Sequence, residues 1–131
     1  MQTYALAAAV LAILIAAVHS VLGEILIFRQ LRSGGFVPSL SAPPLKERHV
    51  RILWASWHLV SVCAAGFSAV LVYLASPGGR YSLAEVVLAA VLFTFLGGAL
   101  LVLVGTKGRH PGWIGLLGVT ALAWAATTSA H

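Results

Sequence analysis

Four long runs of apolar residues, separated by short polar or basic segments, dominate the hydrophobic pattern of the chain. They cover about residues 4–28, 52–75, 83–104 and 113–130. Because an α-helix rises about 1.5 Å per residue, about 20 residues cross the ~30 Å hydrocarbon layer of a bilayer. The first three runs exceed that length and the fourth just reaches it. The pattern predicts an all-α, polytopic membrane protein, a bundle of four transmembrane helices that forms one domain over residues 1–131.

The composition of the chain is that of a membrane protein rather than a soluble domain. Of its 131 residues, 60% are hydrophobic and 8% are charged, with a mean hydropathy of +1.00, whereas soluble domains carry about 25% charged residues. We do not expect the first run to be a signal peptide, because no Lys or Arg precedes it and His19 and Glu24 interrupt it. The single cysteine, Cys63, excludes an internal disulfide and a cysteine-based zinc cluster.

The basic residues are distributed unevenly among the connections. Five lie between the first two runs, two between the last two, and only Arg80 between the second and third. By the positive-inside rule, this predicts a multi-pass protein of the inner (plasma) membrane, with cytoplasmic first and third connections and both termini on the outer side. Since topology accounts for the basic residues, we do not interpret them as a nucleic-acid site. Those of the first and third connections are Arg29, Arg32, Lys46, Arg48, Arg51, Lys107 and Arg109.

The first connection, about residues 29–50, is the longest predicted break between helices. Connections longer than about 12–15 residues are usually functional or disordered. Its apolar residues would let it fold as a partial lid over the cytoplasmic mouth of the bundle, while its glycines and prolines equally suit a flexible linker. These apolar residues are Phe36, Val37, Leu40 and Leu45.

Ionisable and hydroxyl side chains interrupt the first two apolar runs. The first run holds His19, Ser20 and Glu24, and the second holds His58 and Ser61. An acid at the centre of a transmembrane helix costs roughly 2.5–3.5 kcal/mol on insertion scales, so such groups normally have partners inside the protein. The polar residues continue stripes of small residues that recur every three or four positions. We therefore expect them to face the bundle rather than lipid.

Counting residues along the predicted helices places the imidazoles of His19 and His58 at similar depths in the membrane. Counted at about 1.5 Å per residue, His19 lies about 13 Å and His58 about 10 Å from the expected cytoplasmic boundary. Glu24 is shallower, and Arg51 and His110 lie near the boundary itself. Glu24 is also about 140° around the helix from His19, so both can face the interior only if the interior sector is wide.

Two imidazoles at similar depths, together with a carboxylate, favour a site for a metal ion or haem b in the cytoplasmic half of the bundle. Neutral imidazole is the commonest protein ligand for transition metals, and His and Glu together suit zinc, iron or copper. A haem would be held by His19 and His58, with space beside Gly23 and with Arg51 near a propionate. A single metal ion would use His19, His58 and Glu24, with His110 as a further candidate. Residues expected to support such a site are Ser20, Ser61, Trp54 and Trp57.

Two other classes of function fit the same residues. One is proton-coupled transport of a small solute by an oligomer, because the titratable groups lie at successive depths from the cytoplasmic boundary into the membrane. The other is a non-catalytic membrane assembly subunit, in which the polar groups only fix helix register, for example through an ion pair of Glu24 with Arg51 or Arg48. Whether the protein is an enzyme is left open, since no H-E-x-x-H or G-x-S-x-G motif is present.

The expected surroundings of the chain are the lipid bilayer and a protein partner. A chain of 131 residues shields few polar groups by itself. We therefore expect a homo-oligomer or a membrane partner protein, and no nucleic acid.

Three short motifs carry a resemblance to a known group of proteins. His-Ser-x-x-Gly-Glu begins at His19, Trp-His-x-x-Ser begins at Trp57, and His-Pro-Gly-Trp begins at His110. In these motifs the chain resembles a family of small, uncharacterised bacterial inner-membrane proteins with four helices. The resemblance covers almost the whole chain. It implies the architecture and no particular activity.

Overall fold

The described residues, 2–76 and 78–128 of a computed structural model, form four α-helices and one short 3-10 helix. The predicted all-α class is confirmed, and no strand is present in this part of the chain. The elements are α1 (Gln2–Leu26), η1 (Phe28–Leu31), α2 (Glu47–Ala75), α3 (Leu83–Thr106) and α4 (Gly112–Thr128).

Three of the helices are long and apolar enough to cross a membrane, as predicted. These are α1 with 25 residues, α2 with 29 and α3 with 24. The fourth helix, α4, has 17 residues, which at the helical rise corresponds to about 26 Å. It is therefore a shorter apolar helix than the other three.

The helix boundaries differ from the predicted ones mainly at the first connection. The second helix begins at Glu47 rather than at residue 52, because polar residues continue a helix readily and hydropathy marks only the apolar part. Residues 32–46 remain as the connection, and they are folded: the amides of Ser39 and Leu40 both donate to the Leu31 carbonyl. Of the run predicted to end at residue 130, the last two residues lie outside the described part of the chain.

Local signals explain the ends of α3. At its start the Ser82 hydroxyl accepts from the Glu85 amide at 3.2 Å, and the Glu85 carboxylate accepts from the Ser82 amide at 2.6 Å. This reciprocal pair is a capping box. At its end Lys107 (φ 54°) and Gly108 (φ 73°) take left-handed conformations, which stop the helix and turn the chain into α4.

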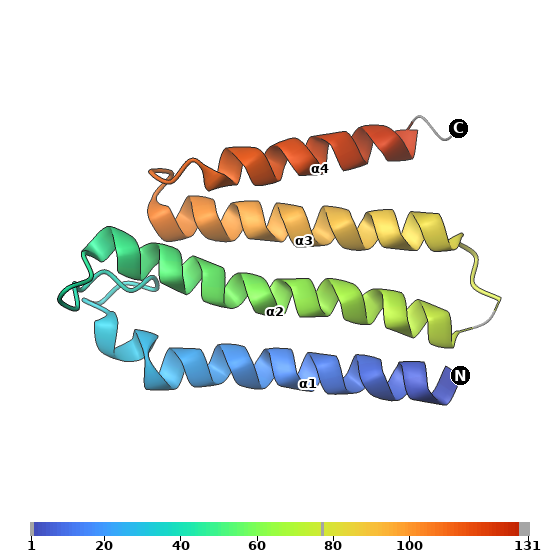
Figure 1. Cartoon of the computed structure of the whole chain (residues 1–131), viewed down its shortest axis with the longest axis horizontal. Coiled ribbons are helices and arrows are strands. Elements are labelled where there is room, and N and C mark those ends of the chain that lie inside the picture. The colour runs from blue at the N-terminus through green and yellow to red at the C-terminus, as the bar shows by residue number, and fades with distance from the viewer. Residues whose placement is uncertain (1, 77, 129–131) are drawn as a thin grey trace.

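The four helices lie side by side in a single layer, in the order of the sequence (Figure 1). Extensive contacts join α1 to α2, α2 to α3, and α3 to α4. The first and last helices therefore form the two edges of the layer. Polar side chains on α1 and α2 lie between neighbouring helices or on a face of the layer, not in a cavity closed by all four helices.

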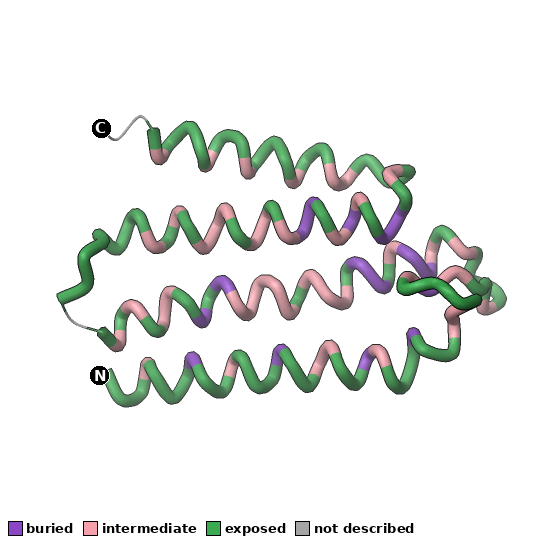
Figure 2. The backbone as a smooth tube through the Cα atoms, turned by 180° about the vertical axis from the view of Figure 1, so that it is seen from behind, coloured by how far each residue is buried: buried purple, intermediate pink, exposed green. Residues whose placement is uncertain are grey.

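Burial is concentrated at the end of the layer that carries the first connection (Figure 2). A small core forms there from Phe28, Trp54, Ala55 and Val102. A Cβ added at Gly105 would lie 3.0 Å from the Ala55 Cβ, so the glycine permits the close approach of α2 and α3. This core anchors the region in which the polar side chains of α1 and α2 meet.

Candidate functional site

Glu24 accepts hydrogen bonds from three side chains, two on α2 and one in the first connection. Its Oε1 lies 2.7 Å from Trp54 Nε1 and 2.9 Å from His58 Nε2, both on α2. Its Oε2 accepts from the Arg32 guanidinium, which belongs to the first connection. The Glu24 side chain is 26% exposed. These donors replace the water that an ionised carboxylate would lose inside a membrane.

From His58 a chain of hydrogen bonds runs along the α1–α2 interface. The His58 Nδ1 lies 3.0 Å from the Ser20 hydroxyl, which lies 2.8 Å from the Ser61 hydroxyl. Ser61 in turn donates to the Ala16 carbonyl at 3.0 Å. Ala16 precedes Glu24 by eight residues, so the chain extends about 12 Å along α1.

The four hydrogen bonds of this chain can form together only in certain protonation states of His58 and Glu24. The Ala16 carbonyl can only accept, so the Ser61 proton is used there and Ser61 must accept from Ser20. With its own proton used, Ser20 must accept from His58 Nδ1, while Nε2 donates to Glu24. All four bonds are therefore made together only when both ring nitrogens carry protons, or when the second proton has moved across to Glu24.

Loss of one proton from this pair would reorient both hydroxyls. With His58 neutral and Nε2–H still directed at Glu24, Nδ1 must accept from Ser20. Ser20 then accepts from Ser61, and the Ala16 carbonyl loses its donor. The protonation of the Glu24–His58 pair is therefore linked to hydrogen bonding deeper in the membrane.

Arg32 fits between the carboxylate and an aromatic ring. Its Cζ lies 5.5 Å from the centre of the Phe36 ring, a cation–π contact. The edge of Phe36 meets Trp54 at a centroid distance of 5.7 Å and an angle of 86°. The Arg32 Nε is buried and has no hydrogen-bond partner in the described structure, so this guanidinium is only partly satisfied.

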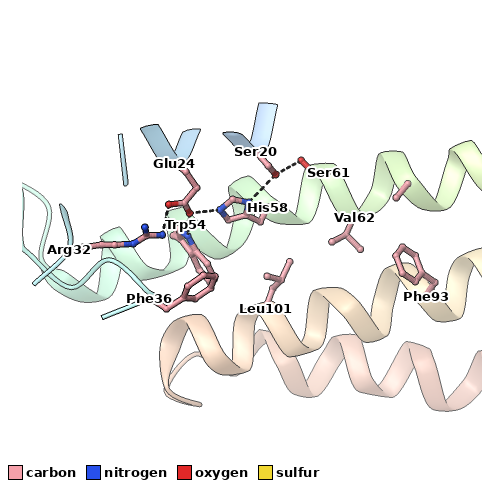
Figure 3. A pocket seen from close by; sticks show the side chains of 11 residues that line it. Ser20, Glu24, Arg32, Phe36, Trp54, His58, Ser61, Val62, Phe93 and Leu101 are labelled. Atoms are coloured by element: carbon pink, nitrogen blue, oxygen red, sulfur yellow. Dashed lines mark hydrogen bonds and ion pairs between the residues drawn. The ribbon is translucent and has the colours of Figure 1, made fainter. Parts of the chain in front are cut away.

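These side chains line an open cavity of about 570 Å³, which we call the polar groove. In Figure 3, Glu24 and Ser20 reach down from α1 to His58 on α2, and Leu101 and Phe93 border the opposite side from α3. One end is polar and carries two aromatic rings; the rest is apolar. The lining residues are Ser20, Glu24, Arg32, Phe36, Trp54, His58, Ser61, Val62, Ala65, Phe93 and Leu101.

His19 lies elsewhere, against Trp57 rather than beside His58. The two rings stack at a centroid distance of 4.3 Å and an angle of 7°, and the Trp57 Nε1 donates to the His19 carbonyl at 3.0 Å. A Cβ at Gly23 would lie 2.1 Å from Trp57 Nε1. The space predicted beside Gly23 is therefore filled by the indole.

Arg51 and His110 also lie apart from the polar groove. Arg51 forms an ion pair with Glu47 at 3.5 Å, one turn along the same helix, and not with Glu24. The His110 Nδ1 accepts from the Gly112 amide at 3.1 Å, at the start of α4. Both line a second cavity at the end of the layer.

The predicted metal ligands are therefore only partly brought together. His58 and Glu24 are in contact, whereas His19 and His110 have other surroundings. Within residues 2–76 and 78–128, no three His, Cys, Asp or Glu side chains are grouped so that they could hold one metal ion. The supporting residues Ser20, Ser61 and Trp54 bond within the groove, and Trp57 packs on His19.

The sequence predicted that Phe36 could help the first connection fold over the bundle, but it gave Phe36 no partner and gave Arg32 no role at Glu24. Both follow the break after α1, where helical periodicity no longer relates a residue to Glu24. The signals available in the sequence were an apolar Phe36 in a glycine-rich connection and the indole N–H of Trp54, which needs an acceptor once it is buried. Comparison with known protein families, curated proteins and solved structures finds no match to this chain. The family resemblance thus stays a prediction.

Proposed function

We propose that the protein exchanges a proton for a small organic cation across the membrane, with the polar groove as the binding site. The observation that carries the proposal is the position of Arg32. Its guanidinium lies between the Glu24 carboxylate and the Phe36 ring, the combination of charge and aromatic face that binds organic ammonium ions. Arg32 would then be a resident cation that the solute displaces.

The connection that carries Arg32 supports such displacement. Arg32 belongs to the segment after η1 and not to a membrane-spanning helix, so it can withdraw without breaking a helix. The apolar part of the groove, with Val62, Phe93 and Leu101, would hold the apolar body of the solute. A solute with one cationic head and an apolar body matches both ends of the groove.

Proton exchange is supported by the hydrogen bonds of Glu24. A solute that takes the place of Arg32 adds no charge, but a cationic head that also reaches Oε1 competes there with the N–H that His58 donates from Nε2. Binding would therefore release a proton from the Glu24–His58 pair, after which Ser20 and Ser61 reverse their hydrogen bonds. Return of a proton restores the fully bonded chain and favours release of the solute.

Transport in liposomes tests this function. The purified protein is reconstituted with the pH dye pyranine inside, and benzyltrimethylammonium is added outside as a permanently charged aromatic cation. We expect the interior to become alkaline as the cation enters and protons leave. Glu24→Gln should reduce the response to that of protein-free liposomes, because the amide can neither hold the cation nor form the charged pair with His58.

Two controls make the result specific. Glu85→Gln makes the same chemical change at the start of α3, where glutamine also serves in a capping box, and should leave the response unchanged. Benzenesulfonate, an impermeant anion of similar size, should cause no pH change. Equal proton movement by the Glu24→Gln variant and the unaltered protein would overturn the proposal.

Ligation of a metal ion or haem b is a second candidate. Its support is the 2.9 Å approach of His58 Nε2 to Glu24 Oε1, since one ion can take the place of the proton between them. Further ligands would have to come from water, haem or another copy of the chain. A Soret band or stoichiometric metal in gently purified protein would support it, and the absence of both would contradict it.

The single-layer arrangement favours an assembly in the membrane. A layer has no enclosed interior, so we infer that a second copy or a membrane partner protein covers the polar groove. We also propose an inner-membrane location with α4 as a fourth crossing, which places both termini on the outer side. If the protein were only an assembly subunit, replacing His19 and His58 together by leucine would leave its stability and assembly intact.

A further inference from the structure

A second cavity, of about 650 Å³, is lined by residues from the start of α2 and from the turn between α3 and α4. Figure 1 shows these two segments at the same end of the layer. We call this cavity the basic cavity. Its wall brings together residues that are far apart in the sequence: the start of α2, and the α3–α4 connection. Its charged residues are Lys46, Glu47, Arg48, Arg51 and Arg109, with His49 and His110 beside them.

The charges of the basic cavity do not balance. Four permanent cations face one carboxylate, that of Glu47, whose side chain is 45% exposed and therefore well solvated. The cavity also borders one helix start and one helix end. The partial positive charge of the α2 N-terminus and the partial negative charge of the α3 C-terminus offset each other, so the side chains determine the potential.

Arg51 is the residue that distinguishes this cavity from an ordinary basic surface. The residue is 7% exposed, yet among the described residues its only ion pair is the 3.5 Å contact with Glu47. Its Nε is buried and has no hydrogen-bond partner in the described structure. A buried guanidinium carries five donors and is costly unless acceptors meet them. Because Arg51 lines the cavity, an anion there would supply acceptors to its guanidinium.

We propose that the basic cavity binds a phosphate group, either that of an anionic phospholipid or that of a free phosphate anion. Arginine recognises phosphate through paired N–H···O bonds, and Arg48, Arg51 and Arg109 line one cavity. Membrane topology alone explains basic residues in a connection, but it does not require a buried arginine facing a cavity. The phosphate site is independent of the cation exchange proposed for the polar groove.

Binding to the full-length protein in a neutral detergent tests the proposal. Native mass spectrometry compares retention of phosphatidylglycerol with that of phosphatidylcholine, and titration calorimetry measures binding of inorganic phosphate. We expect phosphatidylglycerol, inorganic phosphate or both to bind. Each cation removed should weaken binding about fivefold, the effect of one Lys or Arg near a membrane surface.

The variants separate a binding role from a structural one. Arg51→Gln removes the buried guanidinium. The double change Arg48→Gln with Arg109→Gln removes two exposed guanidinium groups. If Arg51→Gln does not fold, the double variant alone tests whether the cavity binds phosphate. Arg80→Gln, in the connection between α2 and α3, is the control for loss of charge. It should bind as the unaltered protein does.

Each outcome decides the matter. Preference for phosphatidylglycerol without binding of inorganic phosphate identifies a lipid headgroup as the source, and binding of inorganic phosphate identifies a soluble anion. Either result, weakened by the double variant and not by Arg80→Gln, supports the site. Equal retention of both lipids without phosphate binding, or equal effects of the double variant and Arg80→Gln, would overturn it.

Discussion

At the scale of single residues, the proposed exchange gives His58 two separable tasks. One is to donate to Glu24, which it contacts through Nε2, and the other, under the proposal, is to carry the proton that solute binding would release. Glutamine at this position can still donate to the carboxylate but cannot be protonated at neutral pH. His58→Gln should therefore keep binding of benzyltrimethylammonium within about threefold, since a hydrogen bond worth about 0.5–1.5 kcal/mol is largely retained, while proton release is lost.

Binding followed by tryptophan fluorescence, and proton release followed with pyranine, separate these tasks. Trp54 donates to the same carboxylate at 2.7 Å, so its emission should respond to a cation at Glu24. The control is Cys63→Ser, which changes a small side chain of α2 outside the groove lining. Proton release by His58→Gln equal to that of the control would show that His58 does not carry the proton.

The sequence predicted which polar side chains interrupt the apolar helices, but it did not predict their partners correctly. His19, His58 and Glu24 were recognisable because ionisable groups are rare in apolar helices. Their pairing depends on the rotation of α1 against α2, which the stacking of Trp57 on His19 sets. Counting residues gives the depth of a side chain in the membrane but not its direction around the helix. The similar depths of His19 and His58 therefore did not imply contact between them.

At the scale of helices, small residues determine how closely α2 and α3 pack. A Cβ at Gly66 of α2 would lie 2.4 Å from Thr94 Oγ1 and 3.3 Å from the Ala90 carbonyl oxygen of α3. The second of these atoms is backbone and cannot rotate away. Small residues thus form a packing surface between these two helices at this point.

Gly66→Leu should consequently push α2 and α3 apart and destabilise the protein. Overpacking of this kind costs about 1–3 kcal/mol, which thermal unfolding in detergent can measure. Gly115→Leu is the matched control on α4, because a Cβ at Gly115 would meet no atom within 4 Å. Equal losses of stability in the two variants would mean that the contact at Gly66 does not hold the helices together.

At the scale of the whole molecule, apolar runs predicted the number of helices but not their arrangement. Four apolar helices suit a closed bundle as well as a layer, since lipid is an acceptable neighbour for every apolar face. In the layer α1 and α4 are edges, and large apolar side chains such as Leu14, Phe67 and Trp124 are exposed. The exposed apolar faces are therefore free to contact lipid or, as proposed above, another protein.

The orientation of that layer in the membrane can be tested with single cysteines. In a Cys63→Ala background, a cysteine replaces Thr3 near the N-terminus, Gly35 in the first connection, or Thr128 at the end of α4, all of them exposed positions. A membrane-impermeant maleimide added to intact spheroplasts should label Thr3→Cys and Thr128→Cys. It should label Gly35→Cys only after the membrane is opened, because the basic first connection is retained in the cytoplasm.

The C-terminal position is the informative one, because α4 has only 17 residues and the minimum for a spanning helix is about 17. If α4 crosses, Thr128→Cys and Thr3→Cys react alike in intact spheroplasts. If Thr128→Cys reacts only after opening, α4 lies on the cytoplasmic side and the chain crosses three times. Labelling of all three positions in intact spheroplasts would contradict a single orientation and indicate copies inserted in both directions.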